Sequence, residues 1–256
     1  MKKAIILVLI YFVMQILGAL TVAPLALLCT YLATGTVDVG LGPKIVVPVM
    51  LLGFLYMAAY LWKKGYLADD GRAYHPTTPR CIACAILSGL AAIFLTSVVM
   101  SVLSFLPDWT QANFAALQGT WMGIASIVVL GPILEELLFR KAVHQELMKH
   151  YGPAGVVVLS GLLFGLSHLN PAQVVGGCLM GFLLAWMYWQ TGSLMPGLVV
   201  HVLNNGLSTW LSIEHPEVEE LADLLPGASL WVGTLAALLL LALTIWGIRK
   251  ASPARA

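Results

Sequence analysis

Apolar segments of about 20 residues follow one another along most of this 256-residue chain. Helices of that length cross the hydrocarbon core of a bilayer, where a helix satisfies its own backbone hydrogen bonds. Hydrophobic residues make up 60% of the chain and charged residues only 10%, whereas an ordinary soluble domain carries about 25% charged residues. The sequence therefore predicts an all-α, polytopic transmembrane helical bundle.

Eight segments qualify as candidate spans. They run approximately over 4–32, 45–62, 81–106, 121–139, 154–168, 172–188, 194–213 and 230–248. The first is long enough to tilt or to kink at Pro24, and its length favours a signal anchor over a cleaved signal peptide. Because no soluble domain or repeat interrupts the series, we expect one integral membrane domain over residues 1–256.

The basic residues predict an orientation, because short cytoplasmic loops collect lysine and arginine. With the N-terminus inside, only Lys44 falls outside, and Arg140 is left out of the count because it sits at the predicted end of a span. The inside segments then hold Lys2, Lys3, Lys63, Lys64, Arg72, Arg80, Lys141, Lys149, Arg249, Lys250 and Arg255. We expect a multi-pass membrane protein with both termini cytoplasmic.

Charge and cysteine content argue against a nucleic-acid partner and against a disulfide framework. The net charge is +1 and no basic stretch could follow a phosphate backbone, so a nucleic-acid partner is not expected. Four cysteines form no disulfide framework, and we interpret them as small buried hydrophobic residues: Cys29, Cys81, Cys84 and Cys178. The expected partners at this point are membrane lipids. Oligomeric state is open.

Several polar side chains lie inside the apolar segments, and they are the first candidates for function. A charge at membrane depth costs roughly 2.5–3.5 kcal/mol even on insertion scales, so it is seldom kept without use. They belong to the fourth, fifth and seventh segments: Glu135, Glu136, Arg140, His168, His201 and Asn205.

The first of these motifs is Glu-Glu-x-x-x-Arg at 135–140. Residues four apart share a helix face, so Glu136 can pair with Arg140, whereas Glu135 is rotated away by about 100° and stays available. Such a carboxylate suits general base chemistry. The alternative is that all three side chains merely snorkel to a membrane boundary.

The other two motifs each contain a histidine. Phe164 and His168 close a glycine-rich segment, and His201 and Asn205 lie four apart on one face within the seventh segment. A buried imidazole and amide are costly without partners, so we expect the three motifs to form one polar cluster. Small residues would allow that close approach: Gly155, Gly161, Gly165, Gly176, Gly177, Gly181, Gly197 and Gly206.

Such a cluster contains the groups that hydrolysis requires. Glu135 and His168 could activate a water molecule, while His201 and Asn205 could donate hydrogen bonds to an oxyanion. No GxSxG nucleophile motif is present. A zinc site of two histidines and a glutamate is chemically possible, but the HExxH spacing is absent, so metal use stays open.

The ordered trio of motifs resembles the signature of the CAAX protease and bacteriocin-processing family (CPBP, also called Abi) of intramembrane endopeptidases. The resemblance covers about residues 121–210, the expected protease core. It implies that Glu135 and His168 activate water, that His201 and Asn205 form the oxyanion pocket, and that Glu136 and Arg140 support the site. It leaves open both a metalloprotease and the metal-free mechanism that we favour. It also implies a protein of the bacterial cytoplasmic membrane and a hydrophobic or membrane-associated peptide as substrate, without identifying that peptide.

Two other classes of function remain as alternatives. A non-catalytic bacteriocin immunity or membrane scaffold protein would use the polar cluster only to hold helices together. A proton-coupled transporter would also place Glu and His in the membrane, but it predicts interrupted helices in matching halves, and here the polar residues concentrate in the second half.

Overall fold

The computed structural model describes residues 1–36, 42–69, 71, 73–74 and 77–252. The described residues form helices, and the predicted all-α class is confirmed. The elements are α1 (Lys2–Thr34), α2 (Gly42–Lys63), α3 (Pro79–Val102), α4 (Gln111–Gln118), α5 (Trp121–Ala125), η2 (Ser126–Leu130), α6 (Gly131–Glu136), η3 (Leu137–Val143), α7 (His144–Met148), α8 (Pro153–Leu166), α9 (Pro171–Thr191), α10 (Met195–Glu214), η4 (Leu221–Leu224) and α11 (Ala228–Ala251).

Each of the eight predicted spans falls on a helical stretch. Six stretches are long and apolar enough to cross a bilayer by themselves, among the residues that the structure describes. The other two are α8, which is shorter, and α10, which carries the polar His201 motif. The helix of the first span continues through Pro24.

The predicted end of the fourth span at residue 139 is wrong. The helical stretch from α5 to α7 runs on from Trp121 to Met148. Lys141, which the pattern of basic residues places in a cytoplasmic loop, lies inside that helix and is fully buried. Arg72 and Arg255, which the same argument counted, lie outside the described residues.

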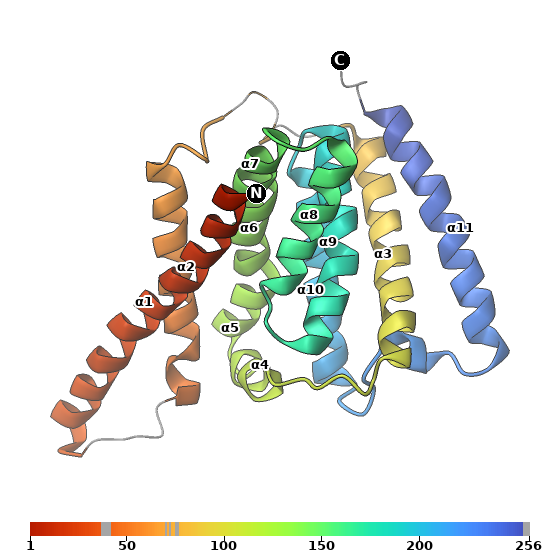
Figure 1. Ribbon diagram of the computed structural model, residues 1–256. Helices are drawn as coiled ribbons and strands as arrows, with labels where there is room; N and C mark the ends of the chain where they lie inside the picture. The colour runs from red at the N-terminus through yellow and green to blue at the C-terminus, as the bar shows by residue number, and fades with distance from the viewer. Residues whose placement is uncertain (37–41, 70, 72, 75–76, 253–256) are drawn as a thin grey trace.

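The motif-bearing helices occupy the middle of the bundle. Figure 1 shows α6, α8, α9 and α10 between the α1–α2 pair on one side and α3 with α11 on the other. The start of α1 and the end of α11 lie at the same end of the molecule (Figure 1), as an even number of crossings requires. The site helices are thus shielded on both flanks by helices that carry none of the motifs.

Glycine permits a close contact between α8 and α9. A Cβ atom on Gly165 would lie 2.6 Å from the backbone of Cys178 and of Val174, and one on Gly181 would lie 2.9 Å from the Gly161 carbonyl oxygen. No real side chain fits at such distances, so the predicted role of these glycines in helix packing is confirmed. A Cβ atom on Gly176 or Gly206 would make only ordinary van der Waals contacts, and one on Gly155 would lie near Tyr151, four residues earlier in the chain.

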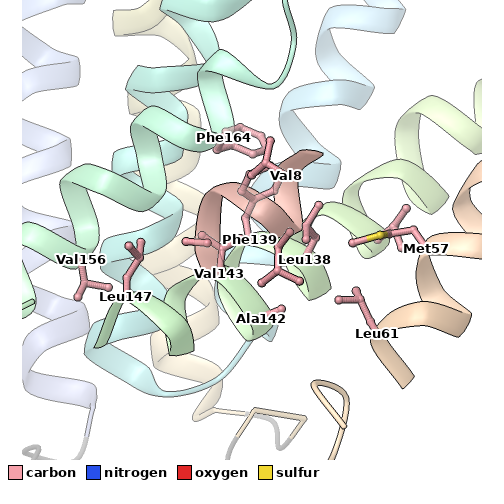
Figure 2. Packing of buried hydrophobic residues seen from close by; sticks show 13 residues of the cluster. Val8, Met57, Leu61, Leu138, Phe139, Ala142, Val143, Leu147, Val156 and Phe164 are labelled. Atoms are coloured by element: carbon pink, nitrogen blue, oxygen red, sulfur yellow. The ribbon is translucent and has the colours of Figure 1, made fainter. Parts of the chain in front are cut away.

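A hydrophobic cluster holds the charged helix in place. Apolar side chains of η3 pack against α1, α2 and α8, as Figure 2 shows. The labelled members are Val8, Met57, Leu61, Leu138, Phe139, Ala142, Val143, Leu147, Val156 and Phe164. Three helices therefore fix the segment that carries Arg140, and Phe164 connects this cluster to the polar site.

Candidate active site

Glu136 is a buried carboxylate with two partners. Its Oε2 atom lies 3.2 Å from Arg140 Nε, and its Oε1 atom lies 2.9 Å from His201 Nδ1. The predicted Glu136–Arg140 pair is confirmed. A Cβ atom on Gly197 would lie 3.3 Å from Glu136 Oε2, so a glycine of α10 leaves the space that this carboxylate occupies.

Arg140 is buried within the bundle and does not snorkel. Its exposed fraction is 0%, and its guanidinium carbon lies 4.8 Å from the centre of the Phe164 ring, over the face. A cation over an aromatic face is attracted by the ring quadrupole. Both contacts of Arg140 therefore point into the polar cluster, which contradicts the snorkelling alternative.

Glu135 remains the more accessible of the two glutamates, as the spacing predicted. Its side chain is 19% exposed, and its Oε2 atom lies 3.4 Å from His201 Nε2. That distance is within ion-pair range but longer than a well-formed hydrogen bond. His201 therefore bridges the two glutamates, with Nδ1 toward Glu136 and Nε2 toward Glu135.

The environment of His168 determines which of its nitrogens carries the proton. His168 Nδ1 lies 3.0 Å from the Phe164 carbonyl oxygen. A carbonyl oxygen can only accept, so Nδ1 is the donor and Nε2 of the neutral ring is an acceptor. That is the state a general base requires.

Phe164 is the common neighbour of both histidines. Its ring packs edge-on against His168, with centroids 5.1 Å apart, and against His201, with centroids 5.4 Å apart. Together with the Arg140 contact, this ring joins α8 to η3 and α10. In the sequence Phe164 is only the start of a motif, because its contacts arise from tertiary packing.

Asn205 is anchored to the helix of the glutamates. Its Nδ2 atom donates to the Ile127 carbonyl oxygen at 2.8 Å, and its Oδ1 atom accepts from Asn204 Nδ2 at 3.1 Å. Because an amide nitrogen carries two hydrogens, the bond to Ile127 uses one donor of Asn205. Asn204, which the motif spacing did not include, is thus a second support.

The helix that carries the glutamates is irregular on both sides of them. The π-helical segments η2 and η3 flank α6, and Ile127 belongs to the first of them. Single π turns shift the direction of the side chains that follow and are frequent at functional sites. The hydropathy and spacing patterns of the sequence do not distinguish a π turn from an α turn.

A metal centre finds no support in the side-chain arrangement. Within the described ranges, no group of three His, Cys, Asp or Glu side chains is arranged to hold a metal ion. No step below passes through a metal ion.

Comparisons with known proteins agree with the motifs. Residues 117–207 match the family model described as type II CAAX prenyl endopeptidase Rce1-like. The chain is 27% identical over 105 residues to YdiL of Bacillus subtilis (strain 168), which is named as a membrane peptidase, with 41% of this chain and 43% of YdiL covered. It is 28% identical over 97 residues to the membrane-embedded CAAX protease MroQ of Staphylococcus aureus (strain USA300), with 36% and 39% covered.

The matched region spans about two fifths of each relative, 43% and 39%. No solved structure matches this chain. The family match from 117 to 207 includes both glutamates, Arg140, both histidines of the cluster and Asn205. Over this segment the chain, a multi-pass helical membrane protein, is similar to the Rce1-like CAAX prenyl endopeptidases.

Proposed function

We propose that this protein is an intramembrane endopeptidase that hydrolyses a peptide bond with a water molecule activated by Glu135 and His168. The observation that carries the proposal is the difference in environment between the two adjacent glutamates. Glu136 is held by Arg140 and His201, whereas Glu135 is 19% exposed beside His201 Nε2. One carboxylate supports the site and the other can reach water.

The first step forms the tetrahedral intermediate. Glu135 takes a proton from water while the His168 Nε2 lone pair orients the same molecule, and the water oxygen attacks the carbonyl carbon. The carbonyl electron pair moves onto oxygen. Asn205 donates its second N–H to that oxyanion, and His201 Nε2–H turns to it from Glu135, a contact that is long at 3.4 Å and therefore weak.

The second step breaks the peptide bond. The oxyanion electron pair restores the carbonyl, the C–N bond breaks, and the amine leaves with the proton that Glu135 held. Glu136 and Arg140 keep His201 in place throughout, because Nδ1 stays on Glu136 Oε1. This cycle consumes one water molecule and needs no cofactor or metal ion.

The substrate class follows from the setting. A site surrounded by membrane helices receives a hydrophobic or membrane-associated peptide, and the surrounding bilayer lipids are the other expected partner. The name of MroQ refers to CAAX substrates, and the matched family to prenylated ones. Whether this chain prefers a prenylated or an unmodified peptide is a result of the experiment below.

The experiment compares membrane-protein termini by mass spectrometry in cells that express the native chain or Glu135→Gln. We expect new termini that disappear in the variant. Glu146→Gln is the matched control, because Glu146 is a buried carboxylate of the same helical stretch that binds Tyr66 and Lys149 instead of the cluster. Identical termini with native and Glu135→Gln proteins, both folded, would support a non-catalytic scaffold or immunity role.

Chelation tests the metal-free mechanism. Purified protein treated with EDTA or 1,10-phenanthroline should cleave an identified substrate at an unchanged rate, because the proposed steps use only side chains. A loss of activity that added zinc restores would overturn the metal-free mechanism. It would leave the assignment as a peptidase intact.

A further inference from the structure

The turn between α8 and α9 has an unusual backbone. After α8 ends, the His168 N–H donates to the Gly165 carbonyl oxygen at 3.1 Å, and Leu169 follows with a φ of 56°. Leu169 is the single non-glycine residue with positive φ in the described part of the chain. A side chain in the left-handed region costs free energy, so contacts around the turn must hold it.

Those contacts come from Asn170, which is 1% exposed. Its Oδ1 atom accepts from the Trp109 N–H at 3.1 Å. Its Nδ2 atom donates to Asp108 Oδ1 at 2.9 Å and to Thr110 Oγ1 at 3.2 Å. Asp108 Oδ1 also accepts from the Thr110 N–H at 2.8 Å and its hydroxyl at 2.7 Å.

These bonds join two segments that are distant in sequence. Asparagine at the N-cap of a helix ordinarily accepts a hydrogen bond from its own first turn. Asn170 is the N-cap of α9 but makes no such bond, and its side chain faces the connector between α3 and α4 instead. The connector residues Asp108 and Thr110 lie outside the family match, which begins at residue 117.

We infer that Asn170 is a positioning residue for His168, and that Asp108, Thr110 and Asn170 form a clamp that fixes the ring of this histidine. The clamp holds the turn two residues after His168. It thereby keeps Nδ1 on the Phe164 carbonyl and leaves Nε2 as the acceptor. The inference rests on the proposed function only where it assigns His168 to the activation of water.

The test reads the His168 tautomer directly. The full-length protein is labelled with ¹⁵N-histidine, placed in nanodiscs and studied by NMR, and His168→Gln assigns the signal. We expect the native ring to be protonated at Nδ1, and Asn170→Ala to give a tautomer mixture. Gln173→Ala is the matched control: Gln173 donates to the same Thr110 hydroxyl at 3.2 Å but does not adjoin His168. It should keep the native tautomer.

Activity provides the second measurement. With a substrate identified from the terminus comparison, Asn170→Ala should lower kcat at least tenfold, leave KM nearly unchanged and shift the pH profile. If Asn170→Ala does not fold, Asp108→Ala combined with Thr110→Ala removes both side-chain acceptors of the Asn170 amide without altering the turn sequence. An unchanged His168 tautomer in the folded clamp variant would overturn the inference.

The two proposals fail in different ways. If Glu135→Gln leaves all termini unchanged while Asn170→Ala still alters the His168 tautomer, the proteolytic function is wrong and the clamp stands. If Glu135→Gln abolishes cleavage but the clamp variant keeps both the native tautomer and the native kcat, the function stands and the clamp is wrong.

Discussion

At the scale of single residues, the stability of the fold should depend strongly on keeping both members of the buried Glu136–Arg140 pair. Both charged groups are buried away from water, so removing one partner leaves the charge of the other uncompensated. Arg140→Gln and Glu136→Gln should each lower the free energy of unfolding by about 3–5 kcal/mol. The measurement is thermal or denaturant unfolding of the purified protein in one detergent.

The double variant identifies the cause of that loss. Glu136→Gln combined with Arg140→Gln should cost clearly less than the sum of the single changes, because no lone charge remains. Glu135→Gln is the comparison variant, since Glu135 is partly exposed and lies outside the pair, and its effect should be smaller. Additive single effects would show that Arg140 and Glu136 act on stability independently.

Residue spacing predicted the pair but not the partners of His201. The four-residue step from Glu136 to Arg140 is a property of one helix, so the sequence contains it. The bridge from His201 to both glutamates joins α10 to α6, and the ring of Phe164 joins α8 to both histidines. Such contacts depend on how helices cross, which no local pattern determines.

At the scale of helices, the α8–α9 contact depends on the absence of side chains. In Gly165→Ala, the new methyl group would meet the backbone of α9, which cannot move aside as a flexible side chain can. We expect a loss of about 1–3 kcal/mol in unfolding free energy, the usual range for overpacking. Gly176→Ala is the control, because its nearest neighbour is the Thr96 methyl at 3.7 Å.

Thermal unfolding of the two alanine variants in parallel checks this prediction. Equal unfolding midpoints for Gly165→Ala and Gly176→Ala would mean that α8 and α9 accommodate the added methyl group without loss of stability.

Hydropathy predicted that these helices exist, but it placed the end of the fourth span too early. Arg140 and Lys141 look like a membrane boundary in sequence, whereas the fold buries both among neighbouring helices.

At the scale of the whole molecule, the arrangement of the termini is testable without a substrate. The two ends of the described chain lie at one end of the bundle (Figure 1). Reporter fusions at each terminus should both indicate the cytoplasm, and a reporter inserted at Glu217 should indicate the opposite side. Reporters on different sides for the two termini would contradict an even number of crossings.

The connector between α10 and α11 makes the stability of the whole fold depend on pH. The Ala222 N–H donates to Ser97 Oγ at 2.9 Å, and Ser101 Oγ donates to Asp223 Oδ1 at 2.8 Å, so the connector is bound to α3. Burial, reinforced by the charges of Asp223 and Glu219, raises the pKa of Glu220 to about 7.

A raised carboxyl pKa means that the folded state binds a proton more tightly than the unfolded chain does. The resulting stabilisation is complete below the ordinary pKa of a glutamate, about 4.3, and is lost as the pH rises through about 7. The unfolding midpoint of the native protein should therefore decrease as the pH is raised from 5.5 to 8. In Glu220→Gln, which cannot ionise there, the fall should be smaller. Equal falls in the two proteins would show that other groups cause the pH dependence and that the charge of Glu220 does not strain the folded connector.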